Sequence, residues 1–87
     1  MDNQKLQRIA EIGEVLTRLA NRGEQLSLMI KSNIENIKSA KGRNDQGSVS
    51  FFLKEKVKLL DKKKHVEARI IKYACELNNE LGIELNK

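Results

Sequence analysis

The chain has 87 residues, with 17 Lys or Arg against 12 Asp or Glu, so its formal net charge is +5. It contains no proline or tryptophan, two Phe, one Tyr and a single cysteine, Cys75. This composition excludes an internal disulfide, and it is typical of long-helix proteins rather than sheets. A chain of this length forms one domain at most, and its core is small.

The first predicted element is a helix over residues 3–41, in which apolar residues alternate three and four positions apart. This heptad seam consists of Ile9, Ile12, Leu16, Leu19, Gly23, Leu26, Ile30, Asn33 and Ile37. Three flanking residues, Val15, Met29 and Ile34, widen the apolar face. Gly23 costs about 1 kcal/mol relative to Ala inside a helix. We therefore expect Gly23 to serve close packing, with a kink at this position as an open alternative.

A turn is predicted over residues 42–50, because GRNDQGSVS is the only dense cluster of turn-forming residues in the chain. Gly42 is the expected left-handed residue at the end of the first helix. Ser48 or Ser50 is the expected N-cap of the second helix, since a serine side chain accepts a hydrogen bond from a free backbone N–H at that position.

The second predicted helix covers residues 50–81 and carries two adjacent apolar ladders. The first ladder consists of Phe52, Leu59, Val66, Ile70, Tyr73 and Leu77. The second ladder consists of Leu53, Val57, Leu60, Ile71, Ala74, Leu81 and Leu85. An apolar face of this width needs two neighbouring elements. Gly82 is the expected left-handed residue after the helix, with Ile83 folding back against it, and residues 82–87 form a short tail.

Two helices of similar length that are joined by a short turn are expected to pack as an antiparallel hairpin. The predicted fold class is therefore all-α, with a single domain over residues 1–87. A turn centred near Asp45 places Gly23 beside Ala68, so that two small residues let the helices approach closely. Phe52 is the aromatic residue expected to be buried next to the turn.

A single hairpin would leave much of this apolar surface in water, and burying a Leu or Ile side chain is worth ~1.5–3 kcal/mol. We therefore expect two hairpins to pair as a homodimeric four-helix bundle. A higher oligomer or the helices of another protein would cover the same surface. The residues expected to form the core and the dimer seam are Ile12, Val15, Leu19, Gly23, Leu26, Met29, Ile30, Ile34, Val66, Ile70, Tyr73 and Leu77.

The sequence gives little support to catalysis. His65 is the only histidine, and no Cys or second His lies at ligand spacing from it, so we interpret it as a solvated helix residue. Cys75 lies near Ile71 and Ala74 and is interpreted as a buried thiol. No P-loop, glycine-rich fingerprint or zinc-ligand spacing is present. We therefore predict a protein that is not an enzyme and that uses no metal or cofactor.

Positive charge is concentrated in residues 31–64. This segment contains ten Lys or Arg and four Asp or Glu, which gives a net charge of +6, and the rest of the chain carries a net charge of −1. In a hairpin this segment is the half next to the turn, so one end of the molecule is expected to be basic. Lysines are common on solvated helix faces, but such a surface also binds polyanions through phosphate contacts. The candidate residues for binding a polyanion or a partner are Lys38, Lys41, Arg43, Phe51, Lys54, Lys58, Lys62, Lys63 and Lys64.

Two functions remain open from the sequence. The favoured one is a helical interaction protein (an adaptor, regulator or inhibitor) that contacts a partner protein, with Phe51 as a candidate anchor. The alternative is a hairpin dimer that binds RNA or DNA backbones through the basic half, although the lysine run lacks interleaved aromatic residues and a recognition motif. No apolar run approaches the ~18 residues of a membrane span, and no signal peptide is visible. We therefore expect a cytoplasmic protein without membrane contact.

Overall fold

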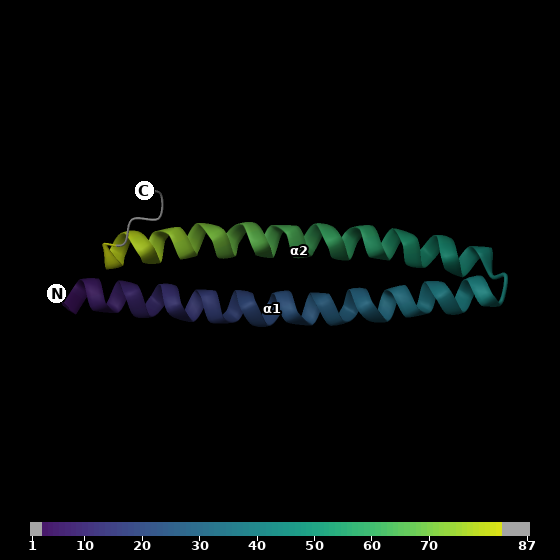
Figure 1. Ribbon diagram of the computed structural model, residues 1–87, viewed down its shortest axis with the longest axis horizontal. Helices are drawn as coiled ribbons and strands as arrows, with labels where there is room; N and C mark the ends of the chain where they lie inside the picture. The colour runs from purple at the N-terminus through teal and green to yellow at the C-terminus, as the bar shows by residue number, and fades with distance from the viewer. Residues whose placement is uncertain (1–2, 83–87) are drawn as a thin grey trace.

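The computed structural model describes residues 3–82, and it is an all-α hairpin. Helix α1 spans Asn3–Gly42 and helix α2 spans Gln46–Leu81. The two helices lie side by side and run antiparallel in a rod of 63 × 26 × 14 Å (Figure 1). No strand occurs within residues 3–82. The predicted all-α hairpin is confirmed.

The heptad seam of α1 faces α2, as its spacing predicts. Its buried members are Ile12, Leu19, Leu26, Asn33 and Ile37, and its half-buried members are Ile9, Leu16, Gly23 and Ile30. Ala40 continues the seam and is fully buried. The helix runs through Gly23 as one element. A seven-residue apolar repeat thus holds the same face of α1 against α2 over the whole length of the helix.

The first ladder of α2 supplies the other half of the core. Leu59 is buried, and the remaining members are half-buried: Phe52, Val66, Ile70, Tyr73 and Leu77. The α2 residues that the sequence assigns to a shared core and dimer seam therefore belong to the contact between α1 and α2. Of the flanking α1 residues, Val15 and Ile34 are half-buried, and Met29 is exposed.

The turn is shorter than predicted, and α2 begins at Gln46 rather than near Ser50. The left-handed residue is Asn44, with φ 57°, and Gly42 is instead the last residue of α1. The Asn44 N–H donates to the Lys41 carbonyl at 3.1 Å, and the Asp45 N–H donates to the Ala40 carbonyl at 2.9 Å. This pair of hydrogen bonds is a Schellman motif, which satisfies the last carbonyls of α1.

Asp45, and neither Ser48 nor Ser50, is the N-cap of α2. Its Oδ1 accepts a hydrogen bond from the Ser48 N–H at 3.1 Å, and its Oδ2 accepts one from the Ser48 hydroxyl at 2.6 Å. These two bonds stabilise the carboxylate, and they hold the pKa of Asp45 below its ordinary value. The backbone of Asp45 thus caps the C-terminus of α1, and its side chain caps the N-terminus of α2. Because one residue caps both helices, a link of three residues, 43–45, is sufficient.

The C-terminal end of α2 follows the prediction. Gly82 is left-handed, with φ 74°, and its N–H donates to the carbonyls of Asn78 and Asn79. The predicted return of Ile83 onto the helix, and the tail with Leu85, lie outside the described residues.

The register between the helices differs from the prediction. A Cβ atom added to Gly23 would lie 3.6 Å from Cγ1 of Val66, so Val66 and not Ala68 is the neighbour of Gly23. Ala68 is exposed. The pairing is displaced by two residues because the link, residues 43–45, is centred on Asn44, one residue before the predicted centre near Asp45.

Candidate interaction surfaces

The second ladder of α2 lies largely in solvent. Its large side chains are between 44% and 67% exposed: Leu53, Val57, Leu60, Ile71 and Leu81. Ala74 is half-buried. The same three-and-four spacing places Lys64, Glu67 and Asn78 in line with them. We call this row of nine positions the α2 stripe: Leu53, Val57, Leu60, Lys64, Glu67, Ile71, Ala74, Asn78 and Leu81.

One ion pair shows which side of the hairpin the α2 stripe occupies. Arg8 Nη2 lies 3.3 Å from Glu76 Oε2, across the two helices. Glu76 is two residues from both Ala74 and Asn78, and residues two apart lie about 200° apart around a helix. The ion pair therefore marks the side opposite the stripe. By the same geometry, the part of α1 on the stripe's side includes Ala10, two residues from Arg8.

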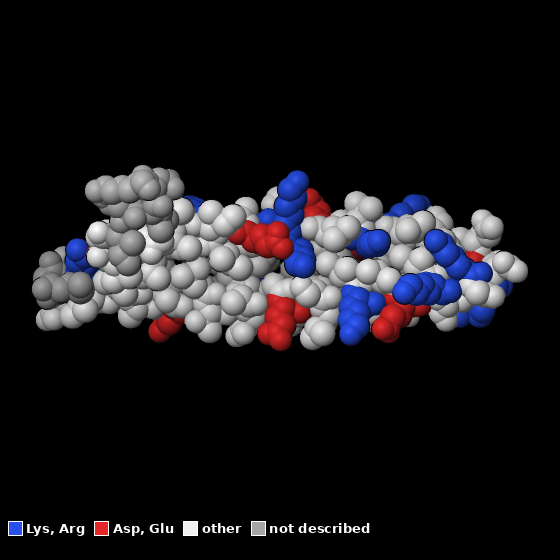
Figure 2. Space-filling model, viewed as in Figure 1, with Lys and Arg blue, Asp and Glu red and all other residues white. Residues whose placement is uncertain are grey.

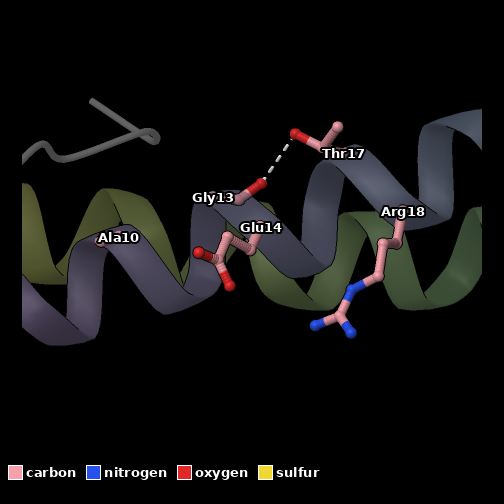
Figure 3. A pocket seen from close by; sticks show the side chains of 5 residues that line it. All are labelled: Ala10, Gly13, Glu14, Thr17 and Arg18. Carbon is pink, nitrogen blue, oxygen red and sulfur yellow. Dashed lines mark hydrogen bonds between the residues drawn. The ribbon is translucent and has the colours of Figure 1, made fainter.

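This part of α1 carries small side chains, and the surface is hollowed there. Ala10, Gly13, Glu14, Thr17 and Arg18 line an open depression of about 730 Å³ (Figure 3). The Thr17 hydroxyl donates to the Gly13 carbonyl at 2.9 Å, so its polar atom is turned onto the helix backbone. The polar side chains at its edge are exposed, and Glu14 and Arg18 extend away from Thr17 (Figure 3).

A second apolar patch lies beside the turn. Phe51 is 58% exposed, and its ring packs edge-on against Phe52, with a centroid separation of 5.4 Å and an interplanar angle of 69°. Phe51, Phe52 and Met29 of α1 line an open depression of about 330 Å³. Phe51 is two residues from Leu53, so this patch lies across the helix from the α2 stripe. We call Phe51 and Met29 the turn patch.

The basic half, residues 31–64, includes Phe51 and begins two residues after Met29. Figure 2 shows Lys and Arg side chains gathered over the turn half of the visible face. The exposed members of the predicted set are Lys38, Lys41, Arg43, Lys54, Lys58, Lys62 and Lys64. Lys63 is half-buried, and its Nζ lies 4.0 Å from Glu67 Oε1. Lys58 Nζ lies 3.5 Å from Glu55 Oε1, and Arg43 Nη1 donates to the Ser39 hydroxyl at 3.1 Å. Most of these charges thus face solvent.

The chemistry-bearing side chains do not converge. His65 Nε2 lies 3.5 Å from Asp61 Oδ2, and both side chains are exposed. Cys75 is exposed, so the expectation of a buried thiol is wrong. Cys75 follows Tyr73 of the first ladder by two residues, and residues two apart lie about 200° apart around a helix, so its side chain faces away from α1. Within residues 3–82, no three His, Cys, Asp or Glu residues gather in a group that would hold a metal ion. Neither α1 nor α2 has the length of apolar sequence that a membrane span requires.

The sequence predicts the apolar members of both ladders and assigns the core and dimer seam to the first ladder, whose residues lie in the contact between α1 and α2. Glu67 belongs to the α2 stripe, although it is in none of the predicted sets of residues. The heptad spacing alone places Glu67 in this row, because Glu67 lies seven residues after Leu60 and seven before Ala74. Comparisons with protein-family models, with curated proteins and with solved structures found no match to this chain.

Proposed function

We propose that the chain is a non-enzymatic helical interaction protein, an adaptor, regulator or inhibitor, that works as a homodimer. The observation that carries the proposal is the α2 stripe. Isolated exposed apolar residues are ordinary on protein surfaces, whereas five large apolar side chains that are exposed along one row of a helix mark an interaction site. Two hairpins that cover each other's stripes form a four-helix bundle, in which each helix has two neighbours.

The turn patch is the candidate contact for a partner protein. Because Phe51 lies across the helix from the α2 stripe, a dimer formed through the stripe leaves Phe51 and Met29 open. Aromatic and Met side chains are enriched where proteins bind one another. The exposed lysines of the same half of the hairpin favour a partner that presents apolar side chains among carboxylates, since opposite charges speed association. The dimer would offer two such patches.

The homodimer is tested by placing charge on the α2 stripe. Val57→Asp with Ile71→Asp changes two side chains that are 67% and 65% exposed, so the hairpin's own packing is little affected. We expect sedimentation equilibrium to give twice the chain mass for the wild type and the chain mass for this variant. The matched control is Leu28→Asp, because Leu28 is 62% exposed and lies outside the stripe. Circular dichroism confirms that each variant is helical. A wild-type monomer at about 100 μM would contradict the proposed dimer.

Binding to nucleic-acid backbones is the second candidate, and the exposed basic half is the observation that favours it. Phosphate contacts release counterions, so the affinity for a generic duplex should fall steeply as salt rises. Replacing Lys38, Lys41 and Lys54 with Gln should flatten that dependence. The control replaces Arg18, Arg22 and Lys72, which lie outside residues 31–64, and removes the same charge. Equal slopes for the two triple variants would rule out a site at the basic half.

A further inference from the structure

The α2 stripe has charged residues at its centre and apolar residues on both sides of it. Lys64 and Glu67 occupy the central positions, between Leu60 and Ile71. Lys64 is exposed and forms no ion pair within residues 3–82. Glu67 is 60% exposed and is approached only at 4.0 Å, by Lys63 of the same helix. Both central charges are therefore accessible to a second chain.

We infer that two copies pair antiparallel through the α2 stripe, with the twofold axis between Lys64 and Glu67; this rests on the proposed homodimer. In a twofold contact, if one residue touches another, the reverse contact is made as well. The axis therefore sets each Lys64 against Glu67 of the other copy, which gives two ion pairs. It also pairs Leu60 with Ile71, Val57 with Ala74, and Leu53 with Asn78.

The other registers of the same stripe are disfavoured by charge. A shift by one heptad in either direction sets Lys64 against Leu60 or Ala74, and Glu67 against Val57 or Ile71. Such contacts desolvate a charge without pairing it, which is costly. A parallel arrangement sets Lys64 against Lys64 and Glu67 against Glu67, which repel each other. The antiparallel register centred between Lys64 and Glu67 is the arrangement that pairs opposite charges.

The overall charge distribution favours the same orientation. Residues 31–64 carry a net charge of +6 and the rest of the chain carries −1. A parallel dimer would bring two strongly basic halves to one end of the bundle. The antiparallel dimer sets each basic half beside the other copy's half of charge −1, so that the two basic halves lie at opposite ends.

The surface of α1 accommodates this arrangement. Gly23 lies against Val66, so the proposed axis crosses α1 close to Gly23. The α1 positions on the stripe's side near this point are Thr17, Ala20, Glu24 and Ser27, of which three are small and Glu24 is an exposed carboxylate. Small residues let two helices approach closely. Thr17, Ala20 and Ser27 therefore leave room for the second copy beside α1.

The register is tested by reversing its charges. In the dimer, Lys64→Glu alone creates two Glu–Glu contacts and Glu67→Lys alone creates two Lys–Lys contacts. We expect each single variant to raise the dimer dissociation constant about tenfold, since each loses two attractive pairs and gains two repulsive ones. The double variant restores both pairs and should return the constant to within about threefold of the wild-type value. Lys62→Glu is the control, because Lys62 lies across the helix from the stripe.

The outcomes separate the register from the dimer itself. Unchanged dissociation constants for both single variants would overturn the register, and if Val57→Asp with Ile71→Asp still abolished dimerisation, the homodimer would stand. A double variant as weak as the single variants would also overturn the register. A wild-type monomer would overturn the register and the homodimer together.

Orientation has an independent readout. With Cys75→Ser and Asn79→Cys, a spin label is placed on an exposed residue beside the stripe. The antiparallel register separates the two labels by about 40 Å along the bundle, at 1.5 Å per residue. A parallel dimer would bring them within about 20 Å, at interhelical distances of 8–10 Å. The long distance is the expected result, and the short one would overturn the proposal.

Discussion

Asn33 of α1 donates a hydrogen bond from Nδ2 to the backbone carbonyl of Phe52 in α2, at 3.1 Å. Asn33 is buried in the heptad seam, and its Oδ1 has no hydrogen-bond partner. A polar residue in an apolar seam costs stability, because a buried acceptor without a partner loses its hydration. It also fixes the register, because only one axial position of the helices makes the bond.

Asn33→Leu should therefore stabilise the hairpin while loosening its register. The change removes an unpaired buried acceptor, which costs about 1–3 kcal/mol, and loses a hydrogen bond worth about 1 kcal/mol. We expect the free energy of unfolding in urea to rise by about 1 kcal/mol. Asn33→Ala is the comparison, because it removes the same amide but leaves a cavity, and it should destabilise the chain. A large loss of stability in the Leu variant would show that the hydrogen bond outweighs the unpaired acceptor.

Gly23→Ala should stabilise the chain rather than disrupt it. The added Cβ would meet Val66 Cγ1 at 3.6 Å, which is an ordinary van der Waals contact. Ala is better than Gly inside a helix by about 1 kcal/mol, so the free energy of unfolding should rise by about that amount. Gly13→Ala is the matched control, because a Cβ there meets nothing within 4 Å. A gain at Gly13 combined with a loss at Gly23 would instead indicate that the interface requires glycine.

Asp45 should make the stability of the hairpin depend on pH in the acid range. Its pKa is lowered in the folded state, chiefly by the hydrogen bond from the Ser48 hydroxyl and then by the Ser48 N–H. A lowered pKa means that the stabilisation is fully present above the ordinary value of 3.8 and is lost as the pH falls through the folded-state pKa. Thermal unfolding should show this loss in the wild type. Asp45→Asn keeps a capping side chain but does not titrate, so its melting temperature should fall less between pH 5 and pH 2. Parallel pH profiles for the two proteins would contradict the role of this carboxylate.

Phe51→Ala should weaken the binding of a partner protein while leaving the hairpin and the dimer intact. Phe51 is 58% exposed, so truncating it removes little buried surface from the fold. Interface aromatic residues commonly cost more than 1 kcal/mol when they are truncated, which corresponds to a loss of affinity of roughly tenfold. Binding is measured by titration with an identified partner, and dimer mass is measured in parallel. Leu28→Ala is the control, and equal losses in both variants would remove the turn patch from the proposed function.

The sequence by itself determined two helices and the hairpin they form. The three-and-four spacing from Ile9 to Ile37 fixes which side of α1 is apolar, and a single cluster of turn-forming residues fixes where the chain reverses. These are local properties, because helical periodicity and turn chemistry depend on residues close together in sequence. The C-terminal end of α2 at Gly82 was predictable for the same reason.

Only the tertiary structure decided which ladder of α2 meets α1. Leu59 and Leu60 are the same residue type in adjacent ladders, yet Leu59 is buried and Leu60 is exposed. That choice depends on the length of the link, which Asp45 shortens by capping α2 directly after the end of α1. Moving the start of a helix turns its faces by about 100° per residue. Periodicity therefore predicts that an apolar face exists, but the packing of α1 against α2 selects the part of it that remains open to another chain.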